Sequence, residues 1–310
     1  MDVATLGGFV EANGHRTFAL EGVVSVLPTP FFDDGRLDPD GLRALVEVHA
    51  AARVAGLTAL GAMGESAELS EDEREHVLAV VRATAPDLPL VVGVTAGSVS
   101  LVRERALGAV AAGASAVMVS PTTDVPAADA VRAAAAAGLP IVLQDYPSGY
   151  GVGISATEMV DLAARERLVV GAKIEAPPTP GKIAAVRRRA PRLGATGGLG
   201  GLYLIDELRA GATGVMTGFA LPERLVDIVR TFAVAPDAAE RTWTSLLPLM
   251  RLEAFPPFSL AARKEVWRLR GVIDSSHCRR AGAVLDARAR ADIRRSWEAV
   301  TEATEVAVAS

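Results

Sequence analysis

Short apolar runs rich in β-branched residues alternate with longer Ala-rich amphipathic segments from about Gly22 to Gly218. The runs are continuously apolar, which is typical of strands covered by helices on both faces. They end near residues 27, 62, 94, 120, 144, 173, 197 and 217. Eight such units favour a closed parallel (β/α)8 TIM barrel over an open doubly wound sheet, which stays as the alternative because alternation alone fits both.

Helix start and stop signals separate the apolar runs. Asp38 before Pro39 predicts a capped first turn, and "SEDE" at 70–73 and "SATE" at 155–158 read as capping boxes. Glycines stand where the helices should end, at Gly56, Gly113, Gly138 and Gly211. These signals predict a helix in each connection.

The pattern becomes wholly helical after Gly218. We therefore predict an N-terminal lead over residues 1–21, flexible or strand-like, and a barrel core over 22–220. Residues 221–310 would hold the last barrel helix and a C-terminal helical extension of the same domain.

Composition narrows the class of protein. Half of the 310 residues are hydrophobic but only 5% are aromatic, as expected for Ala-rich helices around Val-rich strands. A formal charge of −5 with mixed signs argues against a nucleic-acid partner. No apolar run reaches the roughly 18 residues of a membrane span, and we see no export signal. A single cysteine, Cys278, fits a reducing compartment, so we expect a cytoplasmic protein without a membrane partner.

One lysine stands at the end of the sixth apolar run, in "VVGAKIEAPP". The chain has 32 Lys and Arg residues, but only Lys173, Lys182 and Lys264 are lysines. Arginine stays protonated, whereas a desolvated lysine can become a nucleophilic amine. We predict that Lys173 forms a Schiff base. The alternative is a structural lysine paired with Glu65 or Glu175.

Catalytic groups of a barrel lie at the carboxyl ends of its strands and in the loops that follow. This rule selects a set of residues around Lys173: Pro28, Thr29, Met63, Gly64, Glu65, Ser66, Thr95, Ser120, Pro121, Gln144, Asp145, Tyr146, Glu175, Gly197 to Gly201, Thr217 and Gly218. None of the four histidines, His15, His49, His76 and His277, is at a predicted strand end, so we expect no metal.

Three motifs resemble one family in the correct order and at the correct strand ends. "GAMGESAELSEDER", "VLQDYPSGYG" and "VVGAKIEA" are similar to motifs of the dihydrodipicolinate synthase and N-acetylneuraminate lyase family, which contains class I aldolases and dehydratases. The resemblance implies that Lys173 attacks the ketone of a small 2-oxo acid, and that backbone N–H groups and the hydroxyl around Gly64 to Ser66 hold its carboxylate. It also implies a homodimer or homotetramer. The C-terminal helices offer the apolar residues Trp243, Leu246, Leu247 and Trp267 for the interface, unless these close the outer layer of the barrel instead. We expect no organic cofactor, because the lysine iminium is itself the electron sink.

Departures from the synthase pattern are equally informative. Ala62-Met63 replaces a threonine pair, Gln144 replaces the tyrosine of the fifth strand, and Gly149 replaces an arginine that binds a second carboxylate. An amide cannot act as a general acid or base. Thr122-Thr123 also replaces an aromatic pair. Lysine biosynthesis is therefore disfavoured.

The segments "QD.P", "KIE.P" and "GATG.MTG" are similar to the 2-keto-3-deoxy sugar-acid dehydratases of the family. The glycine run "GGLGG" lacks the acidic pair expected there, and either opens the pocket or makes a tight turn. This resemblance assigns catalysis to Lys173, Gln144, Glu175 and Asp145. Substrate binding is assigned to Ala62, Met63, Gly64, Glu65, Ser66, Tyr146, Gly198 and Thr217.

The favoured function is therefore dehydration of a 2-keto-3-deoxy sugar acid or a related hydroxylated 2-oxo acid. A pyruvate-dependent aldolase or synthase of the same family is the runner-up. Two other classes stay open: a barrel that binds a phosphate or flavin with its "GGLGG" and "TGF" segments, and a catalytically reduced barrel that only binds a 2-oxo acid.

Overall fold

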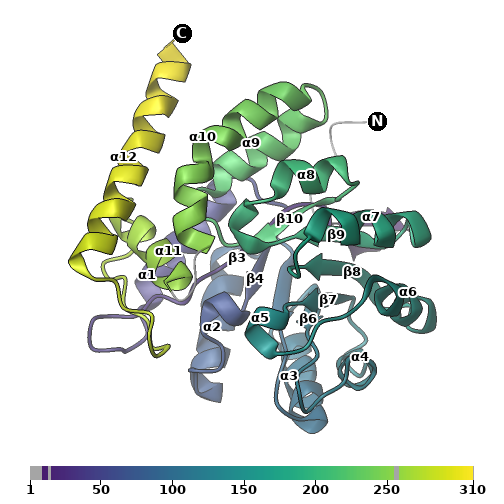
Figure 1. Ribbon diagram of the computed structural model, residues 1–310. Coiled ribbons are helices and arrows are strands. Elements are labelled where there is room, and N and C mark those ends of the chain that lie inside the picture. The colour runs from purple at the N-terminus through teal and green to yellow at the C-terminus, as the bar shows by residue number, and fades with distance from the viewer. Residues whose placement is uncertain (1–8, 13–14, 255–257, 310) are drawn as a thin grey trace.

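The computed structural model describes residues 9–12, 15–254 and 258–309, and contains a closed parallel barrel of eight strands (Figure 1). The strand order is β10-β3-β4-β5-β6-β7-β8-β9, so the predicted barrel is confirmed and the open sheet is wrong. The strands are β3 (Gly22–Val26), β4 (Gly56–Ala59), β5 (Leu90–Gly93), β6 (Ala116–Val119), β7 (Ile141–Asp145), β8 (Val169–Ile174), β9 (Gly194–Gly197) and β10 (Gly214–Thr217).

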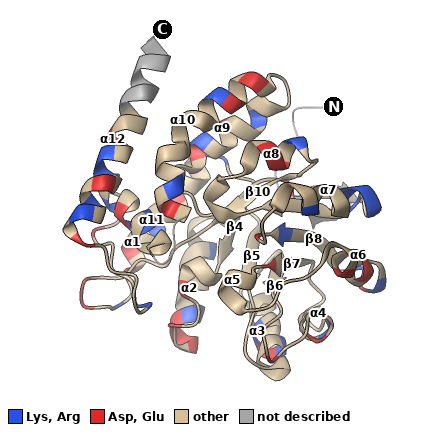
Figure 2. Cartoon of the chain, in the orientation of Figure 1, with Lys and Arg blue, Asp and Glu red and all other residues tan. Residues whose placement is uncertain are grey.

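Helices cover the outside of the barrel and carry most of the charged side chains, while the strands are almost free of them (Figure 2). They are α1 (Pro39–Ala51), α2 (Glu71–Thr84), α3 (Val99–Ala111), α4 (Ala127–Ala135), α5 (Pro147–Tyr150), α6 (Ala156–Arg165), α7 (Thr179–Arg189), α8 (Leu204–Arg209), α9 (Pro222–Phe232), α10 (Pro236–Ala254), α11 (Ser259–Leu269) and α12 (Ala287–Ala309). Two 3-10 turns, η1 (Ala62–Gly64) and η2 (Leu199–Gly201), follow β4 and β9.

The predicted helix starts are present. Asp38 accepts a hydrogen bond from the first turn of α1, and Ser70 and Glu73 form a reciprocal capping box on α2. At α6, Ser155 accepts from the Glu158 N–H at 3.2 Å, which is a serine cap and not the reciprocal box predicted there. Local side-chain chemistry thus sets where these helices begin.

Three of the four predicted glycine stops are confirmed, since Gly113, Gly138 and Gly211 have positive φ after α3, α4 and α8. The fourth is wrong. Helix α1 ends at Ala51, and the residue with the left-handed conformation after it is Arg53. Gly56 is the first residue of β4. A Cβ on Gly56 would lie 3.1 Å from the Pro89 carbonyl oxygen, so this glycine serves close strand packing.

The lead before the barrel is strand-like. Strands β1 (Phe9–Ala12) and β2 (His15–Phe18) pair as an antiparallel hairpin. Beyond the hairpin, Leu20 is buried against the beginnings of two strands, where a Cβ on Gly171 would lie 2.7 Å from it and a Cβ on Gly194 3.0 Å. The lead therefore packs on the amino end of the barrel and leaves the carboxyl ends of the strands uncovered by it.

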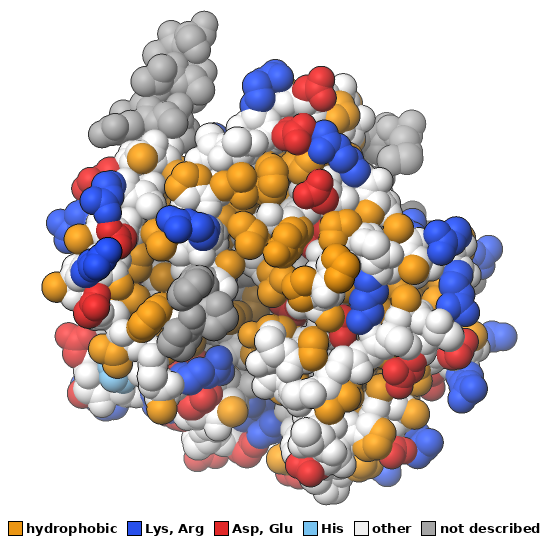
Figure 3. All heavy atoms as spheres, in the orientation of Figure 1, with side chains coloured by type: hydrophobic (Ala, Val, Ile, Leu, Met, Phe, Trp, Pro, Cys, Tyr) orange, Lys and Arg blue, Asp and Glu red, His pale blue; other side chains and the backbone are white. Residues whose placement is uncertain are grey.

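The C-terminal extension packs on the barrel through α9, which contacts β3, and through α10, which contacts α8 and the turn η2, while α11 packs on α10. Leu246 and Trp267 are fully buried, and the Trp243 indole donates to the Gly201 carbonyl at 3.0 Å. In the view of Figure 3, hydrophobic side chains gather at the centre of the face and charged ones lie toward its rim. No helix in the described ranges is long and apolar enough to span a membrane.

Candidate active site

Lys173 lies near the carboxyl end of β8 with 4% of its surface exposed. The barrel register places it between Gln144 on β7 and Thr196 on β9. Its Nζ atom is 3.3 Å from Oε2 of Glu175. The lysine is thus paired with Glu175, one of the two partners considered, and the pairing puts a proton acceptor beside the amine.

The same carboxylate is held from a second side. Gln144 is 2% exposed, and its Nε2 donates to Oε2 of Glu175 at 2.9 Å. Oε2 therefore accepts a hydrogen bond from the Gln144 amide and lies beside Nζ of Lys173, and both contacts orient the carboxylate. Gln144 acts here as a positioning group, which agrees with its inability to carry a proton.

The glycine run after β9 makes room for carboxylates. A Cβ on Gly198 would lie 2.4 Å from Oε1 of Glu175, and one on Gly197 would lie 1.8 Å from Oε2 of Glu207. Two acidic side chains from other elements fill the space beside Gly197 and Gly198. The rest of the run forms the tight turn η2, the second of the two alternatives, and Leu199 and Gly200 of this turn line the cavity. Two carboxylates at this place also disfavour a phosphate-binding loop.

A cavity of about 50 Å³ lies at the barrel mouth beside these groups. Four of the predicted substrate-binding or catalytic loops reach it through Ala62, Met63, Gln144, Tyr146, Lys173, Glu175 and Thr217. Thr217 also accepts a hydrogen bond from the Gly200 N–H at 3.0 Å, which ties η2 to β10. Gly198 borders Glu175 rather than the cavity itself.

Asp145, predicted to be catalytic, does not line this cavity. Its carboxylate is fully buried, bonds the Ile154 N–H at 2.9 Å and pairs with Lys182 of α7 at 2.6 Å. Successive side chains of a strand point to opposite faces, so Gln144 faces the barrel interior and Asp145 faces the helices. Asp145 therefore ties β7 to α7.

The loop after β4 is also arranged differently from the prediction. Glu65 is 0% exposed and paired with Lys264 of α11 at 2.6 Å, away from the cavity lining. The N–H groups of Gly64 and Glu65 donate to Gly61 and Ala62 carbonyls within η1. The Ser66 carbonyl accepts from Arg74. Two of the N–H donors predicted to hold the substrate carboxylate, those of Gly64 and Glu65, are therefore used by the turn itself.

Sequence reasoning missed the part of the cavity supplied by the C-terminal helices. Glu253 of α10 and Ser259 and Arg263 of α11 line it. The strand-end rule overlooks them because they follow the barrel. The available signal was local: the consecutive charged residues Arg263, Lys264 and Glu265 stand between the apolar segments 260–262 and 266–267 of α11. The structure shows that all three are buried.

Two tyrosines lie near Glu175. Tyr146 lines the cavity, and its ring packs edge-to-face on Tyr150 at 5.9 Å. Burial raises the pKa of Tyr150 to about 12, the charge of Glu175 adds to the effect, and a hydrogen bond with Thr95 opposes it. Burial and Glu175 also raise the pKa of Tyr146. Both phenols therefore stay protonated near neutral pH and can donate hydrogen bonds.

The carboxyl group of Glu207 on α8 is buried beside Gly197 of the glycine run. Burial raises its pKa from 4.5 to about 7, a hydrogen bond from Thr179 opposes this, and the nearby Glu175 adds to it. The folded state therefore binds this proton more tightly than the unfolded state. The resulting stabilisation is complete below pH 4.5 and is lost as the pH rises through about 7.

We expect Glu207→Gln to make the protein more stable than wild type above pH 7, by up to about 3 kcal/mol, because no charge then has to be buried. The two proteins should converge near pH 5. Urea denaturation between pH 5 and 8.5 measures the difference, with Asp161→Asn on the surface of α6 as a control. This account would be contradicted if the urea midpoint of Glu207→Gln at pH 8.5 were lower than the urea midpoint of the wild-type protein.

The histidines and the cysteine are outside the site. His49 is buried in α1, its Nδ1 bonds the Leu45 carbonyl at 2.7 Å, and burial lowers its pKa to about 4. Burial raises the pKa of Cys278 to about 11, which keeps it a thiol. Within the described part of the chain, no group of three or more His, Cys, Asp and Glu is arranged to hold a metal ion.

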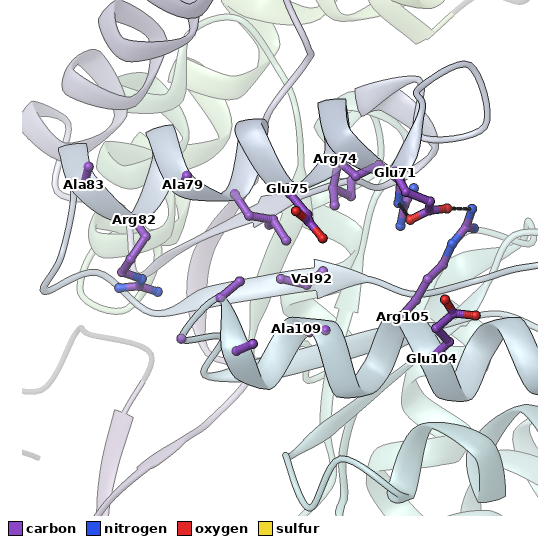
Figure 4. Close-up of a pocket in the computed structure, with 16 residues that line it drawn as sticks. Glu71, Arg74, Glu75, Ala79, Arg82, Ala83, Val92, Glu104, Arg105 and Ala109 are labelled. Carbon is purple, nitrogen blue, oxygen red and sulfur yellow. Dashed lines mark hydrogen bonds and ion pairs between the residues drawn. The ribbon is translucent and has the colours of Figure 1, made fainter.

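A larger hollow of about 800 Å³ lies outside the barrel, between α2 and α3 (Figure 4). Small side chains such as Ala79 and Ala109 line it, and Glu71 bridges Arg74 and Arg105 at one end. None of the residues at the barrel mouth borders it. The hollow is therefore separate from the lysine site.

The fold and the site together define a (β/α)8-barrel enzyme with a buried lysine and carboxylate at its mouth. The chain matches the model of the dihydrodipicolinate synthetase family over residues 19–299. The chain therefore belongs to this family, and the protein is a lyase.

Relatives within the family have different reactions. The chain is 30% identical to L-2-keto-3-deoxyarabonate dehydratase of Azospirillum brasilense over 289 residues, which covers 88% of this chain and 92% of the relative. It is 34% identical to 4-hydroxy-tetrahydrodipicolinate synthase of Sorangium cellulosum over 232 residues, or 72% and 77% of the two chains. The structure of dihydrodipicolinate synthase from Rhodopseudomonas palustris superposes with a TM-score of 0.86 at 31% identity, covering 91% and 99%.

Proposed function

We propose that this lyase is a cytoplasmic dehydratase of an open-chain 3-deoxy-2-oxo acid, with Lys173 as the Schiff-base nucleophile. The observation that carries the proposal is the placement of Glu175 at 3.3 Å from the lysine amine, where it is also held by Gln144. A carboxylate can take and return a proton beside an iminium, which the amide that replaces the family tyrosine cannot do.

The proposed steps use these two residues in turn. The Lys173 amine adds to the C2 ketone, and loss of water leaves an iminium. The Glu175 carboxylate takes a proton from C3, and the electron pair forms an enamine. Protonated Glu175 then gives its proton to the C4 hydroxyl, which leaves as water while the C3–C4 double bond forms. Water finally hydrolyses the imine and frees Lys173.

The similarity to L-2-keto-3-deoxyarabonate dehydratase over most of both chains supports this reaction type. The runner-up is cleavage of a carbon–carbon bond to pyruvate, which the same enamine would serve. That reaction needs a base at the hydroxyl of the bond being cleaved, and the aligned tyrosine is replaced by Gln144. Tyr146 also lines the cavity, but burial and Glu175 raise the pKa of its phenol, which disfavours it as that base.

A panel of hydroxylated 2-oxo acids, assayed for water loss and for pyruvate release, tests the reaction type. We expect water loss from at least one 3-deoxy acid. Pyruvate as the sole product would overturn the dehydratase and leave the aldolase. Pyruvate with borohydride should label Lys173 in either case, and labelling without turnover of any acid would favour a protein that only binds 2-oxo acids.

We also propose that the protein is a homodimer or homotetramer, although a monomeric dihydrodipicolinate synthase variant is among the similar folds. The expected interface residues Trp267 and Leu246 are fully buried within the chain, so they close its own outer layer. The exposed apolar side chains Val99, Leu107 and Val110 instead share one face of α3, at 45–47% exposure. This face is the better candidate.

Light scattering should give a mass of at least twice 32.2 kDa at micromolar concentration. Leu107→Glu should shift the protein toward the monomer, because a charge would be buried in the interface. Val234→Glu, at an 83% exposed position after α9, is the matched control and should leave the mass unchanged. A wild-type mass near 32.2 kDa would rule out assembly.

A further inference from the structure

Two buried oxygen atoms at the cavity lack a hydrogen-bond partner among the described residues. They are Oε1 of Gln144 and Oε1 of Glu253, on side chains that are 2% and 0% exposed. Both residues line the cavity that contains Lys173. A buried acceptor without a donor costs free energy, so paired unfilled acceptors in one cavity point to a ligand that donates hydrogen bonds.

The rest of the Glu253 carboxylate is fixed by the protein. Its Oε2 accepts from the Ala220 N–H at 3.2 Å and from Arg263 Nε at 3.1 Å, and Arg263 Nη2 donates to the Glu253 carbonyl at 3.3 Å. The partner is equally buried, since Arg263 is 3% exposed. These contacts hold Glu253 in one orientation. Burial raises the pKa of Glu253 to about 7, against the opposing effects of Arg263 and the Ala220 N–H, so above that pH Oε1 is the free acceptor of the carboxylate.

Two glycines leave space for the guanidinium group of Arg263 beside the cavity. Its Nη1 lies 3.4 Å from where a Cβ on Gly218 would be, and its Nη2 lies 3.8 Å from that position on Gly200. Both glycines and Arg263 line the cavity. The C-terminal helices thus add a fixed donor and a fixed acceptor to a pocket whose lysine comes from the barrel.

A hydroxyl group both donates and accepts hydrogen bonds, so it matches this pair. A carboxylate only accepts and would leave Glu253 Oε1 unpaired beside a second negative charge, whereas a methyl group would leave both acceptors unfilled. The contrast separates polyhydroxylated chains from dicarboxylic and alkyl chains of the same length.

We propose that Gln144 Oε1 and Glu253 Oε1 accept hydrogen bonds from two hydroxyl groups of the substrate, and that the Glu253–Arg263 pair selects a polyhydroxylated chain. This inference rests on the proposed function, in which Lys173 binds the 2-oxo end of the same molecule. Glu253 and Arg263 are then specificity-determining residues supplied by the C-terminal extension.

Three five-carbon acids test the inference: 4,5-dihydroxy-2-oxopentanoate, 2-oxopentanoate and 2-oxoglutarate. The measurement is the concentration of each that halves borohydride labelling of Lys173 by pyruvate, read by intact mass within the first turnover. For wild type we expect the dihydroxy acid to compete at a concentration about tenfold or more below 2-oxopentanoate, with 2-oxoglutarate weakest.

The variant Glu253→Leu with Arg263→Met removes both charges together, so that neither is left buried alone. This double variant should keep pyruvate labelling. The concentrations of the dihydroxy acid and of 2-oxopentanoate that halve the labelling should become nearly equal. Glu253→Gln, which keeps an acceptor oxygen, should retain part of the preference. Glu240→Gln, at a partly exposed position of α10 paired with Arg209, is the matched control and should retain all of it.

Equal competition by the dihydroxy acid and 2-oxopentanoate in wild type, or strongest competition by 2-oxoglutarate, would overturn the selection while leaving the Schiff base intact. A preference that survives in the double variant would also overturn it. Absence of pyruvate labelling in wild type would overturn the proposed function and this inference with it.

Discussion

Replacement of Lys173 by arginine is expected to abolish turnover and borohydride labelling together. Arginine keeps the positive charge beside Glu175, where Nζ now lies 3.3 Å from Oε2, but it cannot lose a proton near neutral pH to form an imine. The measurement is turnover of the acid panel, together with intact mass after reduction in the presence of pyruvate.

Lys182→Arg is the matched control for this experiment. Lys182 pairs with Asp145 at 2.6 Å on the outside of the strands, and arginine can keep that pair. This variant should retain activity and labelling. Turnover that survives in Lys173→Arg would exclude the Schiff-base mechanism at Lys173. Labelling that disappears in Lys182→Arg would indicate that Lys182, and not Lys173, is the labelled residue.

The second large effect concerns the position of the Glu175 carboxylate. Glu175→Gln should lower kcat by about 10²–10⁴-fold, because glutamine keeps the shape but cannot carry a proton. Gly198→Ala should cause a loss of the same order by another route. Its new methyl group would lie 2.4 Å from Oε1 of Glu175 and would push the carboxylate away from Lys173.

Labelling by pyruvate separates these variants from a loss of fold, since both should still form the imine. Gly181→Ala is the control for the added methyl, because nothing lies within 4 Å of that position on α7. It should have wild-type kcat. If Glu175→Gln turns over at the wild-type rate, another group moves the proton, and Tyr146 becomes the next candidate.

Parts of the site that depend on local order were predictable. Lys173, Gln144, Glu175 and Thr217 were placed correctly at strand ends, because a parallel strand presents its carboxyl end to the same mouth in every unit. The helix starts at Asp38 and Ser70 also followed from their own sequence, since a cap bonds within the first turn.

Other parts depend on which way a side chain points. Asp145 follows Gln144 directly, yet one faces Lys182 on the outside and the other faces Glu175 on the inside. The direction is set by how β7 pairs with β8 in the closed barrel. The residue types at these two positions do not indicate which side chain points inward. Glu65 likewise meets Lys264, which lies 199 residues further along the chain.

By itself, the sequence indicated eight strand–helix units and the place of the lysine at the end of the sixth apolar run, because periodicity and strand ends are properties of neighbouring residues. Closure of these strands into a barrel, in place of an open sheet, was decided by the tertiary structure. The tertiary structure decided that Glu253 and Arg263 share the cavity with Lys173, and that Gly197 and Gly198 make room for acids from elsewhere. Contacts of this kind join segments far apart in the chain, and only the packing of the C-terminal helices on the barrel brings them together.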